Sequence, residues 1–240
     1  MGEEAALKNY EDLKALAGRE GASLFGVADV TAVKDYFYLE PKSAVEGLDY
    51  GISIGIRLSG RILDTVVDEP TKLYAFHYKR VNSLLDWIAI KISNFIQSSG
   101  YSALPVPASH VEDWQNQRGA VSHKMVGHLA GLGFIGRSAL LVNPKYGAQV
   151  RYATILTDFP LKAGEPRPCT QGRDKPDNSG CEDCCACIAV CPVKAIKKDV
   201  KDFNMMACRE LLKTFANKPG IGHSICGICV KACKGNSKHS

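Results

Sequence analysis

The placement of the cysteines constrains this chain more than any other feature of its sequence. All ten cysteines of the 240 residues lie between Cys169 and Cys233, and residues 1–168 contain none. The charge divides at the same point, because the first 168 residues hold 18 Lys and Arg against 18 Asp and Glu, whereas the last 72 hold 12 against 7. An N-terminal portion large enough for its own hydrophobic core is therefore followed by a small, basic, cysteine-rich module.

Metal or redox chemistry is the leading explanation for these cysteines. The sequence begins Met-Gly-Glu-Glu without an apolar signal segment, which argues against export. No apolar run reaches the roughly 18 residues that a membrane helix needs. We therefore expect a cytoplasmic protein without a membrane partner, in which the thiols stay reduced rather than forming structural disulfides.

The cysteine spacing is typical of iron–sulfur loops. One run reads C-x2-C-x2-C-x3-C followed by Pro192, and a second reads C-x2-C-x3-C with one more cysteine upstream. In the bacterial ferredoxin run, three thiolates bind one 4Fe–4S cube and the fourth binds its neighbour. This exchange predicts two quartets of metal ligands, namely Cys181, Cys184, Cys187 and Cys233 for one cube, and Cys191, Cys208, Cys226 and Cys229 for the other.

Two features of the cysteine module leave alternatives open. The two C-x2-C pairs also suit a zinc ribbon, although zinc sites rarely use the full run with its proline. Cys169 and Cys185 remain outside both quartets, either as redox thiols or as spare thiols.

Hydrophobic periodicity predicts alternating helices and strands before the cysteines. Helices are expected over residues 5–17, 72–97 and 121–132, and strands over 23–30, 50–58, 101–106, 139–142 and 150–156. The apolar stripe of the longest helix comprises Leu73, Phe76, Leu84, Ile88, Ile92 and Phe95. This pattern predicts an α+β domain over residues 1–160, a linker or covering loop over 161–180, and the cysteine module over 181–240.

A glycine segment, G-x-G-x-x-G, begins at Gly131. In a dinucleotide-binding fold this pattern follows a strand and opens a helix, but here it follows a predicted helix and precedes a predicted strand. We therefore do not expect a bound dinucleotide at this segment.

The order of the motifs resembles the epoxyqueuosine reductase and reductive dehalogenase family of cobalamin-dependent iron–sulfur proteins. The matching segments are AGLGFIGRSALL (130–141), NPKYG (143–147), LTDFPL (156–161) and the two cysteine runs. The resemblance implies a nitroreductase-like α/β sandwich that holds a corrinoid, followed by a two-cluster ferredoxin-like module that reduces its cobalt. It also implies that the corrinoid is contacted by Gly131, Gly133, Phe134, Gly136 and Arg137.

The sequence also departs from that family. The resemblance places Gln117 where epoxyqueuosine reductases carry an acidic proton donor, and no tyrosine lies between Tyr101 and Tyr146 to replace the tyrosine of reductive dehalogenases. The sequence resembles a short member that lacks the C-terminal helical repeats, so the substrate stays open. The remaining site candidates are His123 and Lys124 as catalytic residues and Ser122 as a cofactor ligand, with His128, Asp113 and Trp114 as weaker alternatives.

These observations predict an oxygen-sensitive oxidoreductase of anaerobic metabolism. It would pass low-potential electrons from two 4Fe–4S clusters to a corrinoid, either for its own substrate or to reactivate the corrinoid of another protein. The alternative is a flavin-dependent (FMN) or cofactor-free electron-transfer protein on the same fold. The expected partners are a ferredoxin or flavodoxin as donor and a corrinoid protein. The basic module offers only Phe203 and Phe215 for base stacking, so we do not expect a nucleic-acid partner.

Overall fold

The computed structural model of the chain describes residues 2–113, 118–165, 181 and 183–235. Its backbone forms two compact units, each of which gathers three stretches of sequence. The sheet unit comprises residues 1–56, 82–132 and 151–167, and the cysteine unit comprises residues 57–81, 133–150 and 168–240. The predicted domain boundaries at residues 160 and 181 stay a prediction. Within the described residues, no helix is both long and apolar enough to span a membrane.

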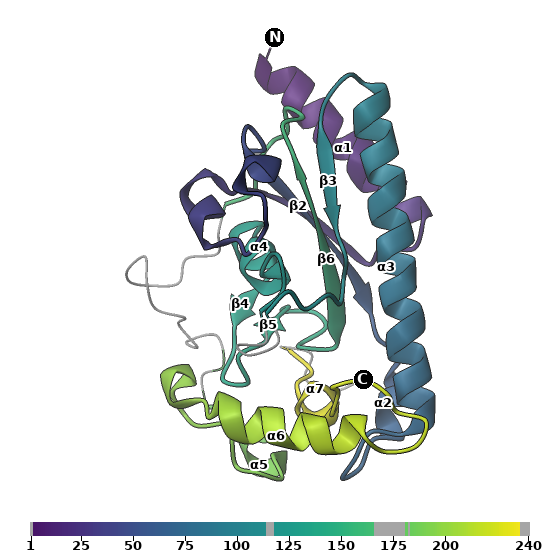
Figure 1. Cartoon of the computed structure of the whole chain (residues 1–240), viewed down its shortest axis with the longest axis vertical. Coiled ribbons are helices and arrows are strands. Elements are labelled where there is room, and N and C mark those ends of the chain that lie inside the picture. The colour runs from purple at the N-terminus through teal and green to yellow at the C-terminus, as the bar shows by residue number, and fades with distance from the viewer. Residues whose placement is uncertain (1, 114–117, 166–180, 182, 236–240) are drawn as a thin grey trace. The chain divides into compact units, whose positions relative to one another are not determined.

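The sheet unit is built around four strands in the order β1 (Leu24–Asp29), β2 (Tyr50–Arg57), β6 (Val150–Thr157) and β3 (Ala103–Val106) (Figure 1). β1 pairs antiparallel with β2, and β3 pairs antiparallel with β6. A methyl group on Gly51 would lie 3.8 Å from Leu156, and the Leu58 N–H donates to the Gln149 carbonyl at 2.8 Å. Both contacts fit one antiparallel register of β2 against β6, so the sheet is antiparallel throughout.

The two faces of β2 differ in side-chain size. Ile52, Ile54 and Ile56 are buried on one face, as the alternating sequence predicts. The other face carries Gly51, Ser53 and Gly55, and a methyl group on Gly51 would lie only 2.9 Å from Val126 Cγ1 of α4 (His123–Leu129). The small residues therefore allow α4 to pack closely on this face. The core there is formed by Ala28, Val30, Phe37, Val45, Leu48, Val106, Ala120, Val121, Val126, Ala130 and Leu156.

Two longer helices complete the amphipathic pattern. α1 (Gly2–Arg19) buries Leu13 and Ala17, while Leu7 is exposed. α3 (Lys72–Ser98) has the predicted length, but its stripe was partly misassigned. Ile88 and Ile92 are buried as expected, whereas the exposed apolar residues of α3 include Leu73, Phe76, Leu84 and Phe95. The buried face is instead made by Val81, Leu85, Ile88, Ala89, Ile92 and Ile96.

The cysteine unit consists of short elements. Its helices are α2 (Gly60–Asp64), α5 (Ala186–Val190), α6 (Met205–Ala216) and α7 (Ile228–Ala232), and a hairpin is formed by β4 (Phe134–Ile135) and β5 (Leu141–Val142). Asn204 caps α6, because its side chain accepts the Ala207 N–H at 2.9 Å. The Lys231 ammonium donates to the carbonyls of Asp64 and Val66, at 3.2 and 2.7 Å, and so ties α7 to the end of α2. Short 3-10 helices cover Thr31–Tyr36 and Lys42–Val45 in the sheet unit and Val200–Asp202 in the cysteine unit.

Candidate metal centre and cofactor site

The first predicted quartet comes together in the cysteine unit. Burial, and after it the neighbouring Cys233 thiol, raises the pKa of Cys187 to about 11. Cys181 and Cys184 act on Cys187 in the same direction, and they also raise the pKa of Cys233, whose main cause is again burial. Electrostatic coupling of this kind requires short distances. The structure therefore gathers the four cysteines that the spacing assigns to one cube, although Cys233 lies more than forty residues downstream of the others.

The second predicted quartet is gathered in the same way. Burial raises the pKa of Cys229 to about 12, with Cys226, Cys208, Cys187 and Cys191 adding to it in that order. Burial also raises the pKa values of Cys208 and Cys226, and Cys191 contributes to both. The coupling of Cys229 to Cys187 joins the two quartets, so the two groups of thiols are neighbours.

Buried thiols with raised pKa values keep their protons in the metal-free protein. A bound metal deprotonates a coordinating thiol, so loading of either quartet releases protons. Among the described residues, no group of three or more His, Cys, Asp or Glu side chains could hold a single metal ion. Cys185 is exposed beside the first quartet, and Cys169 lies outside the described residues.

The turn at residues 143–147 fixes the position of Cys233. The Asn143 side chain accepts the backbone N–H groups of Lys145 and Tyr146, at 3.0 and 3.1 Å, and its backbone pairs with Gly147. The Ala148 N–H then donates to the Cys233 carbonyl at 3.3 Å. A methyl group on Gly147 would lie 2.1 Å from that carbonyl oxygen, so only glycine permits this approach. The NPKYG motif of this chain is therefore explained by the turn that positions Cys233.

Arg137 serves the cysteine loop. Its Nε donates to the Lys198 carbonyl at 2.8 Å, and one terminal nitrogen donates to the carbonyl of Cys184. The planar guanidinium therefore joins the backbone at Cys184 to the backbone at Lys198, and both residues lie far from Arg137 in sequence. The resemblance assigned Arg137 to the corrinoid, whereas these bonds commit at least two of its donors to the cysteine unit.

The glycine segment follows α4 and leads into β4, so it has the helix-before-strand order expected from the sequence. Gly131 has a φ of +74°, and a methyl group there would lie 2.8 Å from the Glu165 carbonyl. A methyl group on Gly133 would lie 2.2 Å from the Val142 carbonyl, and one on Gly136 would lie 3.4 Å from Cys181 Sγ. Each glycine is explained by close packing within its own unit, and Phe134 begins β4 next to them.

His123 is held inside the sheet unit by both ring nitrogens. Nδ1 lies 2.9 Å from Thr154 Oγ1, and Nε2 lies 3.0 Å from the Pro107 carbonyl. Because a carbonyl only accepts, Nε2 carries the proton and Nδ1 accepts from the threonine hydroxyl. Burial lowers the pKa of His123 to about 4, although an edge of the residue stays accessible. A catalytic role for His123 therefore requires one of these bonds to break.

The other candidates of this region are arranged around the start of α4. Ser122 occupies the N-cap position without a side-chain capping bond. Lys124 is exposed, yet the surrounding protein partly desolvates its ammonium and lowers its pKa. Asp113 pairs through its backbone with Arg118, whereas Trp114 and Gln117 lie outside the described residues.

Two polar residues of the sheet unit were not predicted. The hydroxyls of Ser53 and Tyr152 are buried, and within the described part of the chain neither has a hydrogen-bond partner. In the register of β2 against β6, Ser53 faces Thr154 and Gly55 faces Tyr152, so all of them lie on the small-residue face. The sequence signal was available, because Gly51, Ser53 and Gly55 alternate with three isoleucines.

Comparison with known proteins agrees with the motifs. No family model matches the chain. It is 30% identical to epoxyqueuosine reductase of Prochlorococcus marinus over 119 residues, which cover 46% of this chain and 35% of the relative. It is 27% identical to tetrachloroethene reductive dehalogenase of Sulfurospirillum multivorans over 203 residues, covering 77% of this chain and 36% of the relative. The chain thus spans about a third of the length of the curated relatives it matches.

Solved structures show the same kinship at the level of the fold. A catabolic reductive dehalogenase in complex with 3-bromo-4-hydroxybenzoic acid aligns over 95% of this chain and 32% of its own, with a TM-score of 0.72 and 23% identity. Epoxyqueuosine reductase structures match the fold as well. The predicted α+β class is therefore confirmed, and the named relatives are reductases. In sequence and in fold, the chain is a relative of the epoxyqueuosine reductases and reductive dehalogenases.

Proposed function

We propose that this protein is a corrinoid-dependent iron–sulfur reductase, in which two 4Fe–4S clusters pass low-potential electrons to cobalt. The observation that carries the proposal is the sorting of eight cysteines into two adjacent quartets. Eight thiolates in two groups of four match two cubanes in both number and kind of ligand. The electrons would enter from a ferredoxin or flavodoxin, and the clusters would relay them one at a time.

The sheet unit supports the corrinoid part of the proposal. The buried hydroxyls of Ser53 and Tyr152 have no hydrogen-bond partner among the described residues, and buried polar groups normally have partners. The polar edge of a bound cofactor is one source of such partners, and its amide groups could both donate and accept. Burial raises the pKa of Tyr152, so its phenol keeps its proton and acts as a donor. A corrinoid would supply a cobalt centre that accepts electrons and acts as a strong nucleophile when reduced.

The residues of this site would bind and orient the corrinoid, and they would not change their protonation state near neutral pH. His123 stays neutral and holds the start of α4 against β6. Lys124 offers a positive charge at the same helix, and we propose it as a contact for an anionic group. The nitroreductase-like sandwich and a cytoplasmic location remain part of the proposal.

The choice of substrate is also part of this proposal. Solved relatives include an epoxyqueuosine reductase with a tRNA stem loop and a dehalogenase with a brominated hydroxybenzoic acid. The resemblance places Gln117 where an acidic donor is expected, so this chain lacks one feature of the tRNA enzymes. We propose a reductase that either acts on another substrate or reactivates the corrinoid of a partner protein.

The decisive experiment is the cofactor content of the protein purified without oxygen. Two cubanes predict about eight iron and eight sulfide per chain. Added cobalamin should then change its visible spectrum when the clusters are reduced. Zinc in place of iron would refute the cluster assignment. Intact clusters without any cobalamin response would refute the corrinoid, and released FMN would replace it with the flavin alternative.

A further inference from the structure

The cysteine unit has a basic segment beside its second quartet. Residues 194–201, called the lysine segment here, contain four exposed lysines, namely Lys194, Lys197, Lys198 and Lys201. Within residues 194–202 only Asp199 and Asp202 are acidic, and Asp199 lies against Lys201, with its side chain accepting the Lys201 N–H at 2.9 Å and its Oδ2 lying 3.8 Å from the Lys201 ammonium. The segment therefore carries a local excess of positive charge.

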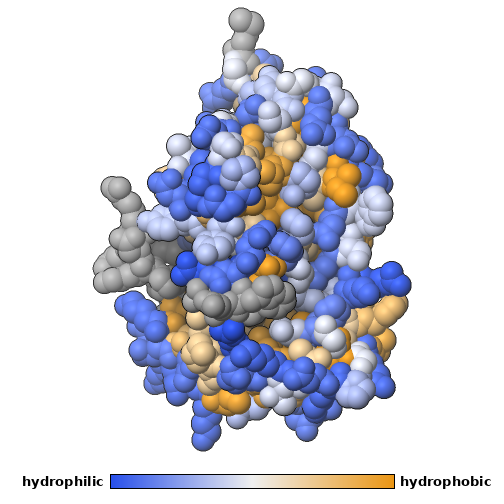
Figure 2. Space-filling model, in the orientation of Figure 1, coloured by the Kyte–Doolittle hydropathy of each residue, from blue (hydrophilic) through white to orange (hydrophobic). Residues whose placement is uncertain are grey.

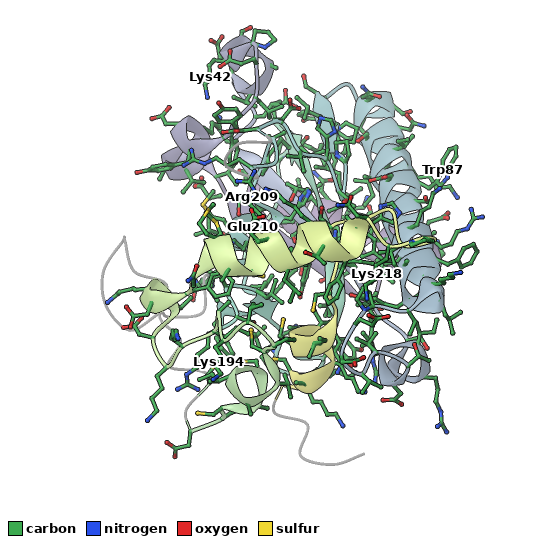
Figure 3. The ribbon with its side chains drawn as sticks, turned by 60° about the horizontal axis from the view of Figure 1, so that its bottom comes forward. Lys42, Trp87, Lys194, Arg209, Glu210 and Lys218 are labelled. Atoms are coloured by element: carbon green, nitrogen blue, oxygen red, sulfur yellow. The ribbon has the colours of Figure 1, made fainter. Side chains whose placement is uncertain are left out.

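The lysine segment lies directly against a predicted cluster ligand. The Ala195 N–H donates to Cys191 Sγ at 3.3 Å. Lys194 adopts a φ of +51°, which turns the chain sharply just before that N–H. Figure 3 labels Lys194, whose N–H donates to the Cys191 carbonyl at 3.0 Å. An electron that arrives at this surface thus has a short path to the second quartet.

Backbone hydrogen bonds also link the lysine segment, through Asn204, to Cys208 of the second quartet. The Asn204 N–H donates to the Ala195 carbonyl at 2.9 Å, and the Cys208 N–H donates to the Asn204 carbonyl at 3.2 Å. The Arg137 bond to the Lys198 carbonyl fixes the middle of the segment. The lysines therefore project from a backbone that is held in place on both sides.

Exposed apolar residues flank the lysine segment in sequence. Val190 is 41% exposed, Met205 is 54% exposed and Met206 is 56% exposed. In Figure 2 the surface over α5 and α6 mixes hydrophobic and hydrophilic patches. Methionine side chains adapt to differently shaped partners, and a small apolar contact with a charged surround is suited to brief encounters.

We propose that the lysine segment is the docking surface for an acidic one-electron carrier protein, which delivers electrons to the second quartet. The inference rests on the proposed function, because it needs a cluster beneath the surface. The carrier loses one electron, the cluster gains it, and no bond is formed or broken. Charge complementarity selects this partner, because lysines raise the encounter rate of an acidic protein and repel a basic one.

The test is the rate at which a reduced acidic flavodoxin reduces the clusters under anaerobic stopped flow. The variant is Lys197→Glu with Lys201→Glu, which leaves the turn at Lys194 intact. The matched control is Lys8→Glu with Lys162→Glu, which changes the net charge equally at exposed positions of the sheet unit. At low salt we expect the first pair to slow reduction about tenfold or more and the control to change it about twofold at most.

Two further measurements separate docking from cluster integrity. Reduced methyl viologen, which needs no protein docking, should reduce wild type and both variants at the same rate. Raising the salt to 0.5 M should remove most of the difference between the two double variants, because it screens charges beyond a few ångström. Lys197→Gln with Lys201→Gln should give an intermediate rate, which covers a failure of the Glu variant to fold.

The outcomes distinguish the two proposals. Equal rates for both double variants with flavodoxin, together with normal reduction by methyl viologen, would overturn the docking surface alone. Wild-type protein that assembles no iron–sulfur cluster would overturn the proposed function and the docking surface with it.

Discussion

The contact between Gly147 and Cys233 provides the sharpest test of how this chain would hold the proposed clusters. Gly147 has a φ of +60°, and a methyl group there would lie 2.1 Å from the Cys233 oxygen and 2.5 Å from the Gly235 nitrogen. A carbon atom normally stays at least about 3.3 Å from a carbonyl oxygen, so Gly147→Ala must push the backbones apart by about 1.2 Å. Both neighbours are backbone atoms, and neither can rotate away.

The matched control is Gly222→Ala in the same unit. Gly222 has a φ of +61°, but nothing lies within 4 Å of a methyl group built on it. Both substitutions therefore share the cost of a left-handed alanine, about 1–2 kcal/mol. Gly147→Ala adds the overpacking, about 1–3 kcal/mol. It also weakens the bond from the Ala148 N–H to Cys233, which contributes about 1 kcal/mol.

We expect Gly147→Ala to lose about 3–6 kcal/mol of unfolding free energy and Gly222→Ala only about 1–2 kcal/mol. Denaturant unfolding of the metal-free, reduced protein measures this difference. Because the shift displaces Cys233, the first cluster should be lost selectively, which halves the iron content and removes one of two cluster signals in electron paramagnetic resonance. Equal destabilisation of the two variants, or full iron content in Gly147→Ala, would show that the close contact does not position Cys233.

Three further predictions concern other residues. The pKa of His123 is lowered from 6.5 to about 4, so between pH 6.5 and 4 the unfolded chain binds more protons than the folded protein. The unfolding free energy of the wild type should therefore fall by up to about 3 kcal/mol over this range. His123→Gln should lack this component when unfolding is measured against pH, and parallel curves for the two proteins would contradict the prediction. Tyr152→Phe removes a buried hydroxyl that has no hydrogen-bond partner among the described residues, so the metal-free protein should gain about 1 kcal/mol in thermal unfolding. Cobalamin affinity should fall if that hydroxyl contacts the cofactor, and a loss of stability would mean that the hydroxyl is already hydrogen-bonded. Arg137→Gln breaks the hydrogen bonds to the Cys184 and Lys198 carbonyls. The Arg137→Gln protein should therefore lose iron to a chelator several times faster than the Lys145→Gln protein. Equal rates of iron loss would show that Arg137 does not hold the cysteine loop in place.

The sequence predicts part of each cysteine quartet from local spacing, whereas Cys233 and Cys208 are assigned only by the ferredoxin exchange rule. Three ligands of the first quartet lie within seven residues, so their spacing alone fixes a tight loop. β2 was predicted because the alternation of its side chains directly reflects its two faces, whereas β4 lies outside every predicted strand. The burial of α3 was harder, since Leu84 and Leu85 are equally apolar and only the packing partner decides that Leu85 is buried and Leu84 exposed.

The roles of Arg137 and His123 depended on contacts that no local pattern reveals. Arg137 reaches a carbonyl 61 positions away, and His123 reaches a hydroxyl 31 positions away. A histidine on a short helix looks like a titratable group until its neighbours are known. Here Thr154 and Pro107 occupy both nitrogens, and desolvation keeps the ring neutral.

The basic charge of the cysteine module takes on a more specific meaning when it is divided among its residues. Each oxidised cube with four thiolates carries about −2, so two cubes cancel most of the formal excess of +5. Several lysines are also engaged elsewhere, as Lys213 pairs with Glu210 and Lys218 pairs with Glu69. In the lysine segment Lys201 lies near Asp199, and the exposed Lys194, Lys197 and Lys198 still leave an excess of positive charge, while the charge of the proposed cluster would lie among the partly buried thiols of the second quartet. An approaching acidic carrier therefore meets the lysines first, and within one Debye length, about 8–10 Å, nearby exposed charges outweigh the net charge of the module. For this reason the position of a charge reversal should matter more than its size, and the two matched double variants measure that difference directly.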